Sequence, residues 1–572
     1  MHESAPPESL SFFDDEDRFK QLIVVLIALV TVLTAIVGLL QNDAGARDDR
    51  ANRQAQAYAF QAMGQRISGV ARVGYDRGDA YRNWSELDTL AAAAEYGGDP
   101  HAARRYWAVA EQLTALSPLL EKTYFDPAAG QPNVAKYEAD TYLVTVTGLA
   151  ERSAAWFAVK QAWDEKANTY VVHLTILAVA LFLLGLATTI SGRARWIFVA
   201  AGLLITAIAV VWVVIVFLAP VPHLPDPAID AYARGIGLAY QNDSKNARAA
   251  FDEALAQAPD YANALFERGS TNYTLGDYQA GVRDFEGARA AGRDDSSVAW
   301  NLAWLYYLQG DFDNSIQTNR RTLEQNPHLL EARFDLALAL LVSGQIEAAK
   351  AEYSQALALA AEQVTQANTA GREPPASLWW SLDESAASLD GILDRIDGFE
   401  ESWWSETPPL EKISQPEAVY AAAQEIVAQI KGTSVALEYT DKPLAGALTA
   451  KISSFDFAQA EYDEAGNFVD YLPADSFPAG TDEVLIVFDY EGMQDGQEVV
   501  WKVYYNGEED ISWRTVEDWS LGTAGTAEFP LSYAYSNVYT LASGEYLVEM
   551  YVDSHLAQRD YFVIEEETGV SE

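Results

Sequence analysis

Three long runs without an Asp, Glu, Lys or Arg constrain this chain more than any other feature of its sequence. Residues 22–40 read LIVVLIALVTVLTAIVGLL, and residues 171–190 and 196–218 form two further apolar runs. At 1.5 Å of rise per residue, a helix over the first run spans roughly 28 Å, which is close to the hydrocarbon thickness of a bilayer. A buried core helix is the alternative for each run, but their length favours three transmembrane helices.

The first run has a second interpretation. Ala44-Gly45-Ala46 resembles the cleavage site of a secretory signal. The apolar run is longer than a typical signal core, however, and the residues before it are net acidic. We therefore expect an uncleaved anchor.

Basic residues at the ends of these runs predict the orientation. Arg18 and Lys20 precede the first run, and Arg193 and Arg195 lie in the turn between the second and third. Cytoplasmic loops of membrane proteins are enriched in Lys and Arg. We therefore expect a multi-pass protein of the cell (inner or plasma) membrane. The tail 1–21 and the turn would be cytoplasmic, whereas the segment 41–170 and everything after residue 218 would lie outside the cytoplasm. An acidic cytoplasmic domain of a salt-adapted organism is the open alternative.

Charge and composition exclude several function classes. The 572-residue chain has 38 Lys and Arg against 83 Asp and Glu, a formal net charge of −45. Nucleic-acid binding depends on neutralising phosphates with Lys and Arg, so no nucleic-acid partner is expected. The chain has no cysteine and six scattered histidines, and it shows no catalytic constellation or phosphate-binding loop. We therefore expect no enzyme activity, cofactor or metal.

The segment 41–170 is rich in alanine and predicts helices near 46–73, 84–95, 100–116 and 133–168. We expect a helical hairpin or small bundle that extends the first two spans. The layout of one span, a helical insert and a two-span hairpin resembles a bacterial membrane domain of unassigned function. A proline-rich stretch, 219–227, follows the third span and is typical of a stiff linker.

A 34-residue period begins after this linker. Gly276, Gly310 and Gly344 are in register, as are Phe251, Phe285 and Tyr353. The period divides residues 228–363 into four units, which are 228–261, 262–295, 296–329 and 330–363.

The sequences GDYQAGVRDFEGA and GDFDNSIQTNRRTLEQNP carry much of the pattern of the tetratricopeptide repeat family, which this array resembles. The resemblance implies a solenoid of helix–turn–helix units. Three positions depart from the family pattern: Arg293 replaces a proline, Asn319 replaces an aromatic residue, and Thr322 replaces an alanine.

In this family the first helix of each unit lines a concave face, and its fifth and twelfth positions usually contact the ligand. The resemblance therefore implies a partner-binding groove lined by aromatic residues at these positions and at one ninth position: Tyr232, Phe266, Tyr273, Trp300, Trp304, Tyr307 and Phe334. The Lys and Asn of the family's carboxylate clamp are missing. An apolar helix or extended polypeptide segment is therefore the expected ligand. A competing interpretation is that the helical extension 364–432, with Trp379, Trp380, Trp403 and Trp404, fills the groove.

After residue 432 the hydrophobic period changes from 3.6 to 2. Strands are expected near 434–439, 448–457, 484–488, 499–505, 526–533, 546–552 and 559–565. Together they predict an Ig-like antiparallel β-sandwich over 433–566 and make the chain a multidomain α + β protein. Two minor hypotheses concern this module. Its acidic residues Asp489, Glu491 and Asp495 suggest calcium binding, and its tryptophans Trp501, Trp513 and Trp519 suggest stacking on sugars.

The sequence as a whole favours a membrane-anchored scaffold for protein–protein interactions, with a protein partner in the repeat groove. One alternative is a self-assembling structural component of the cell envelope, which would be a homo-oligomer. Another is a glycan-binding or hydrolytic protein that uses the sandwich.

Overall fold

The computed structural model describes residues 16–125, 131–399, 405–439, 444, 446–462, 468–532 and 540–566. It divides into two compact units, Met1–Gly276 and Asp277–Glu572. The first contains the apolar helices and the start of the helical repeats. The second contains the remaining repeats and the β-sheets, so the chain is a multidomain α + β protein.

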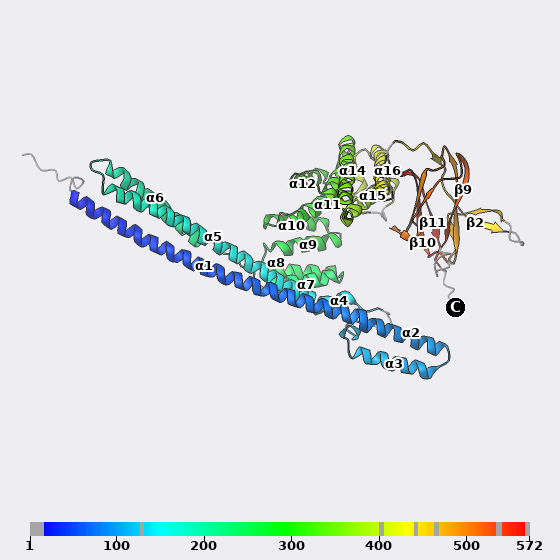
Figure 1. Cartoon of the computed structure of the whole chain (residues 1–572), viewed down its shortest axis with the longest axis horizontal. Coiled ribbons are helices and arrows are strands. Elements are labelled where there is room, and N and C mark those ends of the chain that lie inside the picture. The colour runs from blue at the N-terminus through cyan, green and yellow to red at the C-terminus, as the bar shows by residue number, and fades with distance from the viewer. Residues whose placement is uncertain are drawn as a thin grey trace, which may run out of the picture. The chain divides into compact units, whose positions relative to one another are not determined.

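Two long helices dominate the first unit. α1 (Glu16–Tyr75) and α5 (Val144–Ala187) lie side by side (Figure 1). Buried residues on α1 recur every seven positions, at Ile23, Val30, Val37, Ala44 and Ala51. On α5 they alternate by three and four, at Tyr170, His173, Leu177, Ala180, Leu184 and Ala187. This spacing is that of a coiled-coil seam, because a heptad repeat keeps one face of each helix against its partner.

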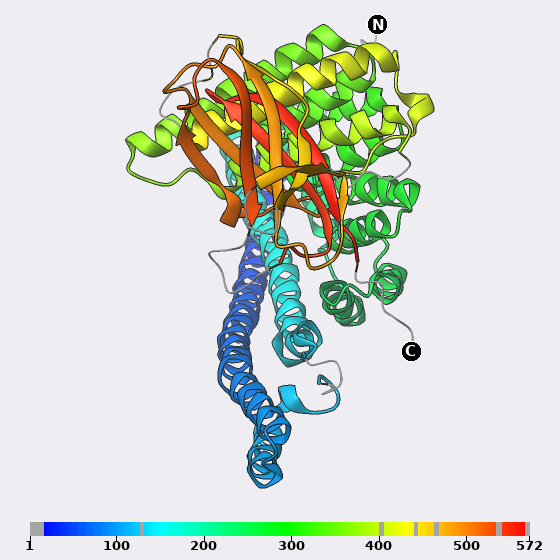
Figure 2. The ribbon, with the colours of Figure 1, turned by 90° about the vertical axis from the view of Figure 1, so that its right-hand side faces the viewer.

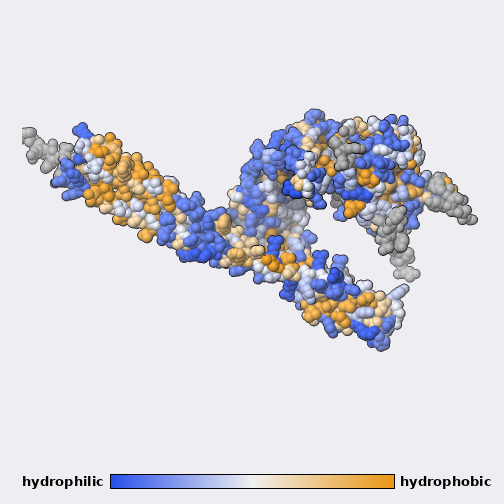
Figure 3. Space-filling view, viewed as in Figure 1, coloured by the Kyte–Doolittle hydropathy of each residue, from blue (hydrophilic) through white to orange (hydrophobic). Residues whose placement is uncertain are grey.

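Three helical stretches, Glu16–Tyr96, Val134–Ala187 and Arg195–Leu218, are long and apolar enough to cross a membrane. The third is α6, which packs on α5. The apolar ends of α1, α5 and α6 together form a hydrophobic surface (Figure 3). Large side chains on it face outward; Leu29 is 61 % exposed and Phe182 is 67 % exposed.

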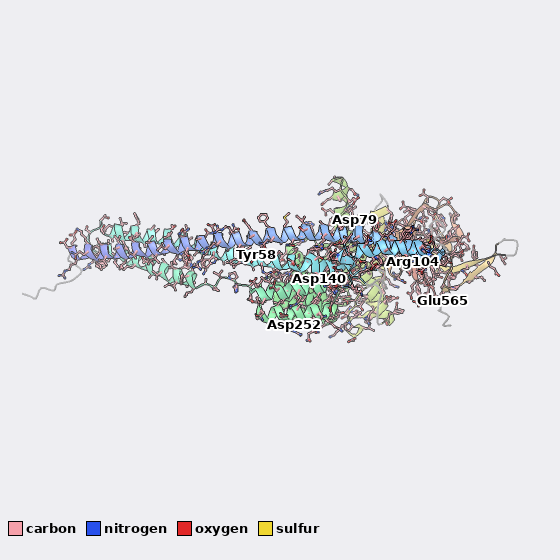
Figure 4. The ribbon with its side chains drawn as sticks, turned by 90° about the horizontal axis from the view of Figure 1, so that it is seen from below. Tyr58, Asp79, Arg104, Asp140, Asp252 and Glu565 are labelled. Carbon is pink, nitrogen blue, oxygen red and sulfur yellow. The ribbon has the colours of Figure 1, made fainter. Side chains whose placement is uncertain are left out.

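Away from these apolar ends, α1 and α5 each pass through a π-helical segment, η1 (Asp76–Tyr81) and η4 (Ala139–Leu143). Between them lie α2 (Arg82–Tyr96), α3 (Pro100–Thr114), η2 (Pro118–Leu120) and α4 (Val134–Glu138). Figure 4 labels Asp79 in η1, Arg104 on α3 and Asp140 in η4. The buried Asp76 carboxylate accepts hydrogen bonds from the hydroxyls of Ser117 and Tyr137. The expected helical hairpin is therefore joined by polar as well as apolar contacts.

The repeats form antiparallel helix pairs. α7 (Asp226–Tyr240), α8 (Ser244–Gln257) and α9 (Ala262–Thr274) belong to the first unit, where Arg152 of α5 pairs with Asp226 and Asp230 of α7 at 2.8 and 2.7 Å. The second unit continues with α10 (Tyr278–Ala290), α11 (Ser296–Leu308), α12 (Phe312–Gln325), α13 (Leu330–Val342) and α14 (Ile346–Thr369).

The Gly-Asp pairs of the sequence period have a direct structural reason. Gly276 and Gly310 adopt positive φ angles of 74° and 72° after a first helix, a conformation that glycine reaches without steric strain. The next residue, Asp277 or Asp311, caps the second helix, because its carboxylate accepts the backbone N–H of Ala280 or Asn314.

Two further helices, α15 (Ala376–Asp397) and α16 (Pro416–Tyr439), extend the array of the second unit, with the 3₁₀ turn η5 (Leu410–Lys412) before α16. α15 packs along α13, and α16 packs along α14. The strand expected over 434–439 is wrong, since these residues are the last turns of α16. Val435 is β-branched but lies, with Ile430 and Lys431, on the buried face of that helix, so tertiary packing overrides its strand propensity.

The C-terminal strands form two sheets that pack face to face (Figure 2). One sheet has the order β1-β5-β2-β3 with β9 beside β5, and the other has β4-β11-β10-β6-β7 with β8 beside β6. Their bounds are β1 Lys451–Ile452, β2 Asp456–Tyr462, β3 Phe468–Pro473, β4 Ser476–Phe477, β5 Glu483–Glu491, β6 Glu498–Tyr505, β7 Glu508–Glu509, β8 Thr515–Asp518, β9 Ala524–Ser532, β10 Gly544–Val552 and β11 His555–Ile564, with the turn η6 (Ile511–Trp513) before β8. Aromatic rings from both sheets fill the core, as where Phe457 meets Phe562 with ring centroids 4.9 Å apart. The arrangement fits the predicted β-sandwich.

Candidate functional site

Aromatic side chains gather along one face of α11 in the second unit. The rings of Trp304 and Tyr307 stack with centroids 4.9 Å apart and an interplanar angle of 25°. One turn earlier, the indole of Trp300 contacts Trp380 of α15 edge-on at 6.1 Å. The positions three and four residues apart place these side chains on one side of the helix.

The aromatic positions of the second unit separate into two depths. Tyr307 is 2 % exposed and Phe334 is 4 % exposed, so both lie in the core of the array. Phe334 packs on Tyr353 of α14 at a centroid distance of 6.1 Å. Trp300 and Trp304 are only half-buried and keep part of their rings in contact with solvent. Buried rings hold the helices together, whereas half-buried ones are available for a ligand.

The same division occurs in the first unit. Tyr232 is 6 % exposed and contacts Phe251 and Tyr261 at 5.9 and 5.1 Å. Its role there is packing between α7, α8 and the loop before α9. Phe266 and Tyr273, on α9, are half-buried.

A carboxyl group that the sequence reasoning missed lies beside the α11 aromatics. The pKa of Asp335 on α13 is raised to about 7, chiefly by burial and also by the charges of Glu384 and Glu331, although a hydrogen bond from the Trp300 side chain lowers it. Its Oδ2 atom is buried and has no hydrogen-bond partner among the described residues. The signal was available, since Asp335 interrupts the apolar run from Phe334 to Val342. A carboxylate oxygen that is buried without a hydrogen-bond partner is unusual beside a packed core.

The downstream helical extension touches this face at its edge. Trp380 is itself 46 % exposed, and α15 stacks on α13 as the next helix of the array. Trp403 and Trp404, which the competing interpretation also used, lie outside the described residues.

The two minor hypotheses about the sandwich gain no site from its structure. Trp501, Trp513 and Trp519 are 1, 9 and 6 % exposed and belong to the core, so they present no ring to a sugar. Asp489 accepts a hydrogen bond from Thr526 Oγ1 at 2.6 Å, and Asp495 accepts the backbone N–H of Gly522 at 2.9 Å. Within the described ranges, no three His, Cys, Asp or Glu residues form a group that could hold a metal ion.

Comparison with known proteins agrees with the helix pairing. Residues 232–281 and 271–329 match the Tetratricopeptide repeat family. Residues 232–329 of the helical array are tetratricopeptide repeats. Such repeats typically form scaffolds for protein–protein interactions and not enzymes. No curated protein matches the chain.

Solved structures similar to the chain include other proteins with these repeats. One is YrrB, described as a tetratricopeptide repeat protein with an unusual peptide-binding site; it is 16 % identical, the match covers 37 % of this chain and 86 % of YrrB, and the TM-score is 0.25. A repeat protein from Parabacteroides merdae ATCC 43184 is 12 % identical over 60 % of this chain and 99 % of its own, with a TM-score of 0.24. MamA from Desulfovibrio magneticus RS-1 is 19 % identical over 23 % of this chain and 75 % of its own, with a TM-score of 0.22.

Proposed function

We propose that this protein is a membrane-anchored scaffold whose tetratricopeptide repeats bind a polypeptide segment outside the cytoplasm. One observation carries the proposal. On α11, the indoles of Trp300 and Trp304 are half-buried, above a core that contains Tyr307. Large aromatic rings that are held in place but not covered supply contact area with little loss of entropy, as at the hot spots of protein interfaces.

The chemistry of this face favours an apolar segment as the ligand. Its exposed groups include two indole rings, and the carboxyl groups of Asp335 and Glu384 beside them both have raised pKa values, chiefly because burial disfavours their charged forms. A C-terminal carboxylate would lose hydration beside these rings and buried carboxyl groups. An amphipathic helix or an extended segment that presents apolar side chains fits better.

Side chains at both ends of the apolar helices support the membrane anchor. At one end, Arg47 of α1 lies over the ring of Trp163 of α5 at 4.8 Å, and the Lys166 ammonium donates to the carbonyl of Ala219 at 2.5 Å. At the other end, the Arg195 guanidinium lies 4.0 Å from the centroid of Phe19. Aromatic and basic residues of this kind are enriched at membrane–water interfaces. The basic turn that contains Arg193 and Arg195 supports a cytoplasmic N-terminus.

The partner-binding part is tested by affinity purification of the tagged full-length protein in mild detergent. A stoichiometric companion protein should be recovered with the wild type and lost with Trp300→Ala/Trp304→Ala. Trp107→Ala is the matched control, because Trp107 is 39 % exposed and belongs to α3, which is not a repeat helix. Equal recovery from all three proteins, or recovery of the protein alone, contradicts the proposal. Protease protection in spheroplasts tests the side of the membrane.

A further inference from the structure

α1 carries a second apolar stripe that is separate from its seam with α5. The stripe consists of Phe60, Met63, Ile67 and Val70, which are 74, 62, 59 and 51 % exposed. These residues lie after the apolar run 22–40, in the part of α1 that continues past the candidate membrane span. Four large apolar side chains exposed in succession on one helix are unusual for a water-facing surface.

The spacing of the stripe is that of a coiled-coil seam. Its members are three, four and three residues apart, which corresponds to the a, d, a and d positions of two heptads. At about 100° per residue they fall within an arc of about 80° on the helix. The centre of this arc lies about 120° from Ala62, and Ala62 is buried on the opposite seam. α5 therefore cannot cover the stripe.

In a hairpin of two helices with no other partner, each helix would turn its large apolar side chains toward the other. On α1 the arrangement is the reverse. Toward α5 the helix presents the small residues Ala51, Ala55, Ala62 and Gly69. Its large apolar residues in the same segment point elsewhere. A two-helix hairpin that had no other partner would gain more by burying the large side chains.

We propose that this stripe packs against the same stripe of a second copy of the chain, in a parallel coiled coil outside the bilayer. The inference rests on the membrane anchor of the proposed function, because the anchor provides the geometry. The apolar run of α1 precedes the stripe on one continuous helix, so anchored copies present it in the same direction and at the same height. Identical a and d positions then meet in register.

The flanking residues also fit a second copy. Among residues 56–71 the single charged side chain is Arg66. In a parallel pair with Phe60 at an a position, Arg66 occupies a g position and faces Ala71 at e, so no like charges meet. Gly64 has open space around its α-carbon and leaves room for close approach.

Two heptads form a short seam, and membrane confinement compensates for this. Helices held parallel in one bilayer associate at a high effective concentration, whereas the same seam between free molecules would be weak. The interaction should therefore be strong in membranes and should weaken on dilution in detergent.

Disulfide cross-linking in native membranes tests the proposal cleanly, because the natural chain has no cysteine. Full-length Met63→Cys and Val70→Cys proteins should form a dimer on mild oxidation. The control is Gln61→Cys, an exposed position on the same turn of α1 but about 140° from the centre of the stripe. It should cross-link at least tenfold less. Ile67→Arg added to Met63→Cys should abolish the dimer band, and Gln61→Arg should not.

Equal cross-linking at the control, no dimer at either stripe position, or an adduct with a different protein would each overturn the proposal. Carbonate extraction of the same membranes distinguishes failure of the dimer proposal from failure of the membrane anchor. If the protein stays in the pellet and no dimer forms, this inference fails while the anchor stands. If carbonate releases the protein, the membrane anchor of the proposed function fails as well. Trp300→Ala/Trp304→Ala should leave the dimer band unchanged.

Discussion

The indole of Trp300 meets the indole of Trp380 edge-on, with ring centroids 6.1 Å apart and an interplanar angle of 75°. This contact joins the first helix of one repeat to the helical extension that follows the array. It orders one edge of the aromatic face on α11 and leaves much of Trp380 exposed. The face is thus preorganised by the chain's own extension, which lowers the entropy lost when a ligand binds.

The buried carboxyl of Asp335 should make stability depend on pH. Its pKa is about 7 in the folded protein against an ordinary value of 3.8. Between these two pH values the folded state binds the proton and the unfolded state does not, so stability falls as pH rises from 5 to 8. Asp335→Asn should remove about 1–2 kcal/mol of this dependence.

Thermal unfolding of the full chain at about pH 5 and about pH 8 measures this change in stability. Asp313→Asn, a change at an exposed acid of α12, is the control and should behave as wild type. A wild-type melting temperature that follows pH in the same way as that of Asp335→Asn would contradict the assignment.

Asn319 should be replaceable with a gain in stability. It stands where the repeat pattern has an aromatic residue, it is fully buried, and its side-chain oxygen and nitrogen both lack hydrogen-bond partners within the described part of the chain. A buried amide without partners costs about 1–3 kcal/mol, so Asn319→Leu should stabilise the array by about 1–2 kcal/mol. Denaturant titration checks this, and a loss of stability would indicate that the amide has a function in the folded state.

A buried ion pair between α16 and the sandwich should be sensitive to truncation. The Lys431 ammonium bonds to the Glu549 carboxylate and lies 3.1 Å from Asp390 Oδ2, and both acids are almost completely buried. Burial raises the pKa of Glu549, but the charge and hydrogen bond of Lys431, together with the hydrogen bond from Tyr551 and the charge of Arg559, bring it below the ordinary value. Lys431→Ala leaves both acids without that cation and should destabilise the second unit by about 3–5 kcal/mol.

The matched control for Lys431 is Lys350→Ala. Lys350 also bonds to a glutamate, Glu425, but this pair is far more exposed than the Lys431 pair, so its loss should cost much less stability. Thermal unfolding distinguishes the two. Equal effects would show that burial does not strengthen the Lys431 contact.

Two glycines of α1 should respond oppositely to alanine. A Cβ on Gly69 would lie 2.2 Å from Cβ of Tyr142, whereas a Cβ on Gly64 would meet nothing within 4 Å. Gly69→Ala should therefore push α1 and η4 apart and destabilise the hairpin by about 1–3 kcal/mol. Gly64→Ala should be neutral or stabilise by up to about 1 kcal/mol. Hydrogen exchange of the backbone amides of α1 measures the change in stability caused by each substitution.

Much of the fold was predictable because local chemistry determines it. Gly276 predicts the end of one helix, and Asp277 predicts the cap of the next. Charge-free runs long enough to cross a membrane predict apolar helices. How deeply each aromatic side chain is buried was harder to predict from the sequence. The 34-residue register places Trp300, Tyr307 and Phe334 on the same face of equivalent helices, but burial depends on the neighbouring helix, which the register does not describe.

One wrong prediction and one omission of the sequence reasoning have the same origin. Val435 favours a strand locally, yet it lies in a helix and packs against Val500 and Tyr551 of the sandwich. Asp335 was not singled out in the sequence, because its raised pKa comes chiefly from burial in the folded array and also from the charges of Glu384 and Glu331. Both results come from contacts between residues far apart in sequence.

Site-specific photo-cross-linking is the most direct test of whether the aromatic face of α11 binds another polypeptide. A photoreactive amino acid is placed at residue 304 of the full-length protein in cells, and at Gln317, an exposed position on the second helix α12, as the control. If this face binds a partner, we expect a defined adduct with another polypeptide from position 304 and none from position 317. The same adducts from both positions, or no polypeptide adduct at position 304, would contradict this expectation.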